Sequence, residues 1–136
     1  MTASTVSVAA SAAHLIPKPY ETGLCMTPMT ATIATTSLDD VGDIVELGYL
    51  PANCTVFGVL IQTASLAASA LVYKIQIAGV DFVTSVTTGS GAGAAWWFAN
   101  APLVLTAVSK VTFQVTTVAT TPAAGLFNCS PLYANN

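Results

Sequence analysis

The chain is organised around residues Asp43 to Gln62, DIVELGYLPANCTVFGVLIQ. Its side chains alternate between apolar and other types, which is the period-2 pattern of strands with one face on a core. In the first half, one face is formed by Val45, Leu47 and Tyr49. In the second half, it is formed by Phe57, Val59 and Ile61, with Gly58 and Gln62 on the other side. The sequence therefore predicts two antiparallel strands joined as a hairpin.

The turn between these strands is predicted at Leu50-Pro51-Ala52-Asn53. Pro51 fixes φ at a value that suits a turn, and Asn53 tolerates a positive φ. The reversal of the chain thus has a physical cause in addition to a suitable composition.

Further strands are predicted on both sides of this stretch, at residues 29–36, 70–78, 82–86, 103–106, 110–118 and 126–133. The clearest is 70–78, where Leu71, Tyr73, Ile75 and Ile77 share one face. Pro131 has no amide hydrogen, so the last strand is expected to lie at an edge, to contain a bulge or to end there. Short strands separated by turns predict an all-β fold, an antiparallel β-sandwich with a jelly roll as the favoured topology.

The N-terminal residues differ from the rest of the chain. They are rich in Ala, Ser and Thr, and Pro17 and Pro19 impose an extended path. We therefore expect an extended N-terminal arm at residues 1–28 and a β-sandwich domain at residues 29–136. The arm either lies across a neighbouring subunit or is a disordered tail. In the first case the contacts would come from Leu15, Ile16 and Tyr20.

Charged residues are scarce. They make up 7% of the 136 residues, where about 25% is ordinary, so much of the surface is expected to contact other subunits. Nucleic acid is an unsuitable partner, because phosphate binding needs clustered Lys and Arg. This chain has no Arg, and Lys18, Lys74 and Lys110 lie far apart in the sequence.

Residues 54–73 form an uncharged run that is long enough to span a membrane as a helix. Its polar positions, its β-branched first half and the absence of flanking Lys or Arg favour two strands joined by a loop, so no membrane is expected as a partner. The three cysteines, Cys25, Cys54 and Cys129, form no CxxC pattern and are odd in number. We therefore expect reduced thiols in a protein made in a cytosolic compartment.

Trp96-Trp97-Phe98 is the densest aromatic patch. Neighbouring residues of a strand face opposite ways, so Trp96 and Phe98 share one side and Trp97 takes the other. One side is expected to be core. The other is a contact surface or, in a sharper interpretation, a platform on which a sugar ring stacks.

No set of residues predicts catalysis. His14 is the only histidine and lies in the predicted arm, so no base is available to activate a Ser, Thr or Cys. Asp39, Asp40 and Asp43 form the best carboxylate cluster, but they lack the ligand spacing of a calcium loop. We therefore expect no enzyme activity, no cofactor and no metal.

The run Asp40-Val41-Gly42-Asp43-Ile44-Val45-Glu46-Leu47, followed by Leu50-Pro51-Ala52-Asn53 and an apolar strand, resembles small head decoration or cement proteins of tailed bacteriophages. The strand that ends in Gly at Ile75–Gly79 and the closing segment Gly125–Tyr133 are also similar. Asn53 stands where a glycine is common in that group, and Pro131 interrupts the last strand. The likeness covers roughly residues 29–133 and is one of pattern, without a diagnostic motif.

The resemblance implies a virion structural protein that binds the outer surface of a capsid, often as a homotrimer, and stabilises it without catalysis. Its partners would be the major capsid protein and other copies of itself. The alternative is a carbohydrate- or receptor-binding module of a tail fibre or secreted protein, which the aromatic patch suggests. A glycan array with Trp96→Ala and Trp97→Ala separates the two, because a stacking residue loses ligand and a core residue loses the fold.

Overall fold

The structure, a computed structural model, describes residues 5–7, 23–67, 70–87 and 92–136. These residues form two sheets of five strands each. Sheet A contains β1 (Thr5–Ser7), β4 (Ile44–Leu50), β6 (Val72–Ile77), β7 (Val80–Val86) and β9 (Ser109–Thr117). Sheet B contains β2 (Leu24–Met26), β3 (Met29–Ile33), β5 (Cys54–Thr63), β8 (Gly93–Leu105) and β10 (Gly125–Asn135).

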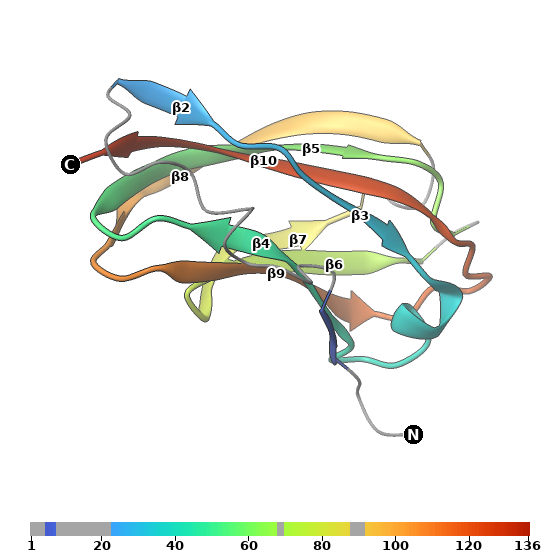
Figure 1. Cartoon of the computed structure of the whole chain (residues 1–136). Helices are drawn as coiled ribbons and strands as arrows, with labels where there is room; N and C mark the ends of the chain where they lie inside the picture. The colour runs from blue at the N-terminus through green and yellow to red at the C-terminus, as the bar shows by residue number, and fades with distance from the viewer. Residues whose placement is uncertain (1–4, 8–22, 68–69, 88–91) are drawn as a thin grey trace.

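The two sheets pack face to face, with sheet B as the upper layer in Figure 1 and sheet A as the lower. Sheet A has the order β1-β4-β9-β6-β7. Sheet B has the order β2-β10-β5-β8. β3 also pairs with β10, on the same side as β2 but further along the strand. All pairings are antiparallel except that of β1 with β4. The predicted all-β sandwich is confirmed, whereas the narrower expectation of a jelly roll stays a prediction.

The predicted hairpin in residues 43–62 is wrong, although both of its strands are present. β4 pairs with β1 and β9 in sheet A, and β5 pairs with β8 and β10 in sheet B. The turn between them has the predicted conformation: Asn53 has a φ of 58°, and the Cys54 thiol donates a hydrogen bond to the Pro51 carbonyl oxygen over 3.3 Å. This turn carries the chain from one sheet to the other.

Most later connections also cross between the sheets. From β3 onwards, the described strands include one pair, β6 and β7, that is consecutive and hydrogen-bonded. Its two-residue loop is Ala78-Gly79, with φ values of 56° and 76°. A positive φ at both central residues gives a turn whose twist matches that of the strands. By contrast, β5 and β6 lie in different sheets, as do β9 and β10.

Two bulges change which residues of Asp43–Gln62 face the core. The register shifts between Glu46 and Gly48 in β4, and between Val56 and Gly58 in β5. Val45, Leu47, Val59 and Ile61 are buried as predicted. Tyr49 and Phe57, predicted to lie beside them, are only half-buried. An inserted residue reverses the parity of the positions beyond it, so strict alternation fails there.

The core lies between the sheets and is built around three aromatic rings. Tyr73 stacks on Phe113 with ring centroids 4.5 Å apart, and both rings meet the edge or face of Phe127 at 5.5 and 5.2 Å. Such pairs stabilise a core by about 0.5–1.5 kcal/mol beyond the area they bury. The predicted inward face of residues 70–78 is confirmed: Leu71, Tyr73, Ile75 and Ile77 are fully buried.

The last strand, β10, lies in the middle of sheet B and not at its edge. The Pro131 carbonyl oxygen accepts a hydrogen bond from the Thr27 amide, at the point where β2 has ended and β3 has not begun. The missing amide of Pro131 therefore falls where the neighbouring strand is interrupted. A register shift follows between Leu132 and Tyr133, but the extra residue there is Phe57 of β5, so the predicted bulge in the last strand and its predicted edge position are both wrong.

The run 54–73 that could have spanned a membrane forms β5 and the beginning of β6. In the described part of the chain, no helix is long and apolar enough to cross a bilayer. The only helical turn in that part is the 3-10 segment η1 (Thr35–Ser37). Strands β1 and β2 lie within the range predicted as an arm; residues 8–22 lie outside the described residues, so the role of the arm stays a prediction.

Candidate interaction surface

Charge is distributed unequally between the two sheets. Sheet A carries Glu46, Lys74, Asp81 and Lys110 on four of its strands. No strand of sheet B contains an Asp, Glu, Lys or Arg. The two outer faces of the sandwich are therefore chemically different, although the inner faces are alike.

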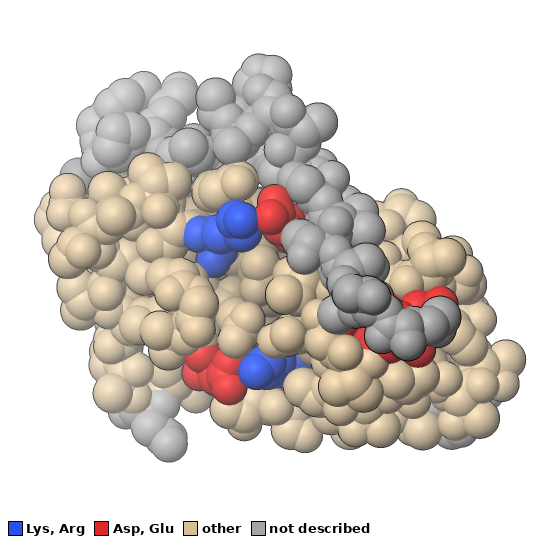
Figure 2. Space-filling model, turned by 90° about the horizontal axis from the view of Figure 1, so that it is seen from below, with Lys and Arg blue, Asp and Glu red and all other residues tan. Residues whose placement is uncertain are grey.

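The outer face of sheet A is polar and holds two ion pairs. The Lys110 ammonium lies 2.8 Å from the Glu46 carboxylate, and the Lys74 ammonium lies 3.1 Å from that of Asp81. Figure 2 shows this face, on which two Lys side chains each lie beside an acidic one. A hydrogen bond from Gln76, and then one from Lys74, lowers the pKa of Asp81. The hydrogen bond to Glu46 raises the pKa of Lys110.

The outer face of sheet B is apolar, and we call it the apolar face. Residues directly opposite one another on neighbouring strands point to the same side of a sheet. The register therefore places Trp96 beside Leu60, and Leu132 beside Met26. The large apolar side chains of this face are Leu24, Met26, Leu60, Trp96, Phe98, Val104, Leu126 and Leu132.

Several of these side chains are strongly exposed. Leu24 keeps 68% of its area accessible to solvent, Phe98 65%, Val104 61% and Trp96 46%. Single exposed apolar residues are ordinary on a protein surface, but several on one uncharged sheet face are typical of an interaction surface.

The aromatic pair on β8 is held in place by a glycine on β5. The Trp96 and Phe98 rings are nearly parallel, with centroids 5.8 Å apart and planes inclined by 7°. Gly58 lies opposite Phe98, and a Cβ added there would approach Cδ1 of Phe98 to 2.8 Å and the Trp97 carbonyl oxygen to 2.5 Å. Only a glycine at position 58 lets the Phe98 ring and the β8 backbone come this close to β5.

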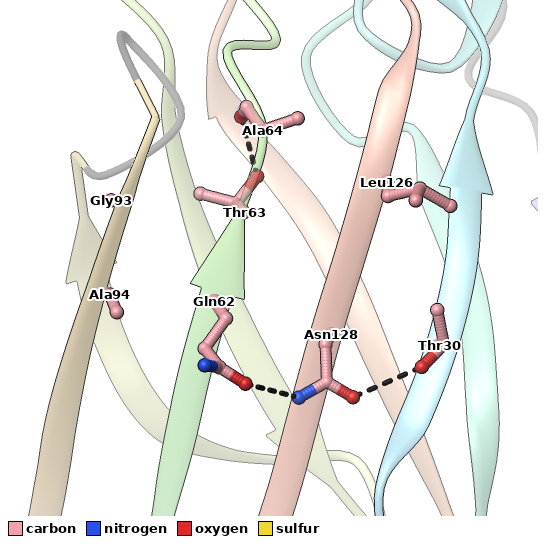
Figure 3. A pocket seen from close by; sticks show the side chains of 8 residues that line it. All are labelled: Thr30, Gln62, Thr63, Ala64, Gly93, Ala94, Leu126 and Asn128. Atoms are coloured by element: carbon pink, nitrogen blue, oxygen red, sulfur yellow. Dashed lines mark hydrogen bonds between the residues drawn. The ribbon is translucent and has the colours of Figure 1, made fainter.

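A shallow hollow of about 410 Å³ lies on the same face, beyond Ala94. Figure 3 shows a row of polar side chains across three strands: Thr30 donates to Asn128 over 3.1 Å, and Asn128 donates to Gln62 over 3.2 Å. Asn128 also donates to Ser130 over 3.0 Å. These groups largely satisfy one another, so the hollow is a polar border of the apolar face.

The structure places only some of the predicted contact residues on the apolar face. Trp96 and Phe98 lie together on the apolar face, and Trp97 packs partly buried against the core, as the alternation predicted. Leu15, Ile16 and Tyr20 lie outside the described residues. Sequence reasoning missed the other members of the face: Leu24 and Leu126 lie on strands that are far apart in the chain, and Val104 lies beyond the bulge in β8.

The three predicted acidic residues do come together. One carboxylate oxygen from each of Asp39, Asp40 and Asp43 lies within 4.8 Å of the others. The Asp43 carboxylate accepts a hydrogen bond from the Asp40 amide over 3.1 Å, which shapes the turn before β4. Desolvation and the neighbouring carboxylates raise the pKa of Asp39. This arrangement is that of an acidic turn, and the absence of a metal stays a prediction.

The cysteines are free thiols, and two of them are buried. Burial raises the pKa of Cys54 to about 11 and that of Cys129 to about 12. Since the thiolate is the reactive form, neither residue is suited to nucleophilic or redox chemistry at neutral pH.

No protein family and no curated protein matches the sequence, but the fold is similar to chains in structures of phage capsids. One, from the capsid of Ralstonia phage GP4, has a TM-score of 0.75 and 19% identity, covering 97% of this chain and 98% of the other. A second, from the capsid of cyanophage Pam1, has a TM-score of 0.72 and 18% identity, covering 86% and 88%. A third, from the capsid of the Helicobacter pylori bacteriophage KHP30, has a TM-score of 0.53 and 11% identity, covering 84% and 93%. At these identities the likeness is one of fold.

Proposed function

We propose that this protein is a structural component of a phage virion, which binds the outer surface of the capsid and bridges capsid subunits. The observation that carries the proposal is the apolar face, an uncharged sheet surface with exposed aromatic and aliphatic side chains. The nearly full-length likeness in fold to chains from phage capsids supports the same assignment.

The physical mechanism is stabilisation by selective binding. A protein that binds the assembled shell and not its separated subunits shifts the equilibrium toward the shell by mass action. Such binding needs a surface that gains free energy when water leaves it, and Trp96 and Phe98 are the largest exposed side chains of the apolar face. The acidic and basic side chains of sheet A would remain in solvent.

The major capsid protein is the proposed partner, with other copies of this chain beside it. A trimeric unit, which the resemblance implies, is part of the proposal; light scattering of the purified protein checks it, because the number of chains should then be a multiple of three. Mass spectrometry of purified particles from the phage that encodes the chain should detect it in amounts comparable to a capsid subunit.

The binding test uses particles from which the protein has been stripped. Phe98→Ala should weaken rebinding by about 2 kcal/mol, or roughly 30-fold, because a central aromatic contact is lost. Val41 provides a matched control: it is 63% exposed, close to the 61% of Val104, but lies before β4 and away from the apolar face. Val104→Ser should weaken rebinding and Val41→Ser should not. Equal rebinding by Phe98→Ala and the wild type would contradict the proposal.

A carbohydrate-binding module is the second candidate, favoured by one observation. The hollow with Gln62 and Asn128 begins at Ala94, two residues from Trp96, so amide groups and an aromatic ring adjoin. Two features count against it: Phe98 covers one face of the Trp96 ring, and the amides bond to each other. Oligosaccharide binding on an array that Trp96→Ala abolishes, in a protein that does not bind particles, would favour this candidate.

A further inference from the structure

The edges of the two sheets are protected to different degrees. An edge strand presents unpaired amide and carbonyl groups, and natural proteins guard such edges with short strands, charges, prolines or bulges. In the described structure, β1 and β2 have three residues each, and β3 has five. β7 has seven residues, carries Asp81 and contains irregular register.

β8 is the exception. It has 13 residues, contains no charged side chain and pairs only with β5 among the described strands. Pro102 and a bulge between Phe98 and Leu103 protect its second half. Its first half contains no proline, and Gly93 to Phe98 keep a continuous register with β5.

The core is also incompletely covered along this half of β8. The inward positions of the central strands β5 and β10 are almost fully buried, as at Val59, Ile61 and Phe127. The inward positions of β8, Ala95, Trp97 and Ala99, all remain partly accessible. A further strand beside β8 would pair the open backbone groups and cover these side chains together.

We propose that residues 93–99 of β8 pair with the same residues of a second copy of this chain, antiparallel about a two-fold axis. The strand that fits must be extended, uncharged and open at one edge, and β8 itself has these properties. A two-fold contact is self-complementary, so each copy supplies what the other lacks. All charges of the described strands lie on sheet A, so no like charges meet across the contact.

Side-chain parity and size select the register. Opposite residues must point to the same side of the joined sheet, which requires the axis to pass beside a residue and not between two. Centring the axis at Trp96 pairs all seven residues. It places Ala94 opposite Phe98 of the second copy, and Ala95 opposite Trp97 of the second copy, so that small side chains face large ones. The apolar faces of both copies then lie on the same side of one continuous sheet.

The first experiment measures mass by light scattering over a range of concentrations. The wild type should form an even-numbered species: a dimer, or a hexamer where other surfaces hold a trimer. Ala94→Lys places a charge on the exposed side of β8 and should weaken this association at least 30-fold, with unchanged thermal unfolding. Thr84→Lys, at an exposed position of the other long edge strand β7, is the matched control and should associate like the wild type. An odd-numbered wild-type species, or equal association of both variants, would overturn the inference.

The second experiment tests the register without a charged substitution. In a Cys25→Ser background, Trp96→Cys should form a covalent dimer on oxidation, because the two residues at the axis are directly opposite and within reach of a disulfide. Ala94→Cys, whose partner is Phe98, should not. Failure of Trp96→Cys to cross-link, or equal cross-linking by both, would refute the pairing. Both experiments use the isolated protein, so their outcome is independent of capsid binding.

Discussion

The outer faces of sheets A and B differ far more than their inner faces. Both inner faces are built from the same kinds of side chain and meet around Tyr73, Phe113 and Phe127. Outside, sheet A has two ion pairs, and sheet B has none of the charged residues of the described strands. The inner faces supply the stability of the fold, and the difference between the outer faces is the basis for proposing the apolar face as the partner surface.

The largest expected effect is a difference in the free energy of unfolding. It is expected between a residue on the inner face of sheet B and its neighbour on the outer face. Phe127 is fully buried and Leu126 is 61% exposed on the apolar face. Phe127→Ala should lower the free energy of unfolding by about 3–5 kcal/mol, because it leaves a cavity among the aromatic rings. Leu126→Ala should change it by less than about 0.5 kcal/mol. Chemical denaturation measures both values, and similar losses would show that the apolar face contributes to the fold itself.

A smaller effect is expected at two glycines, one in each sheet. Gly58→Ala should cost about 1–3 kcal/mol, because the new Cβ meets the Trp97 backbone and the Phe98 ring. At Gly48 of sheet A, the nearest atoms belong to the end of the flexible Met29 side chain, at 2.9 Å. Gly48→Ala should therefore cost less than Gly58→Ala. Thermal unfolding checks the order, and the reverse order would contradict the tight packing of β8 on β5.

The smallest expected effect is on the pH dependence of stability, and it arises from Asp81 of sheet A. Because the pKa of Asp81 is lower in the folded protein than in the unfolded chain, its ionisation stabilises the fold above the unfolded pKa. That contribution is lost as the pH falls through the folded pKa. The group is largely exposed, so Asp81→Asn should cost less than about 1 kcal/mol at neutral pH and should flatten the decline of stability in acid. Measuring the free energy of unfolding across the acidic range tests this. If the variant loses stability in acid as the wild type does, Asp81 does not cause that loss.

The candidate surface could be predicted only in part. The sequence was sufficient to place Trp96 and Phe98 on one side of a strand and Trp97 on the other, because side chains alternate locally. It could not indicate that Leu24, Val104 and Leu126 join them, since these residues belong to β2, β8 beyond its bulge, and β10. A signal was present in Gly93 to Ala99, where neither side of the strand carries a charged or polar side chain.

Local sequence was sufficient to predict most of the strands and the conformation of the turn at Asn53. Alternation at Leu71, Tyr73, Ile75 and Ile77 predicted a fully buried face, and Asn53 predicted a positive φ, because both depend on neighbouring residues alone. The pairing of the strands, by contrast, depends on how the whole chain packs. The turn after Leu50 suits a hairpin and a crossing between sheets equally well, and both bury the same alternate side chains. Packing of the whole chain selected the crossing, and two bulges then turned Tyr49 and Phe57 away from the core.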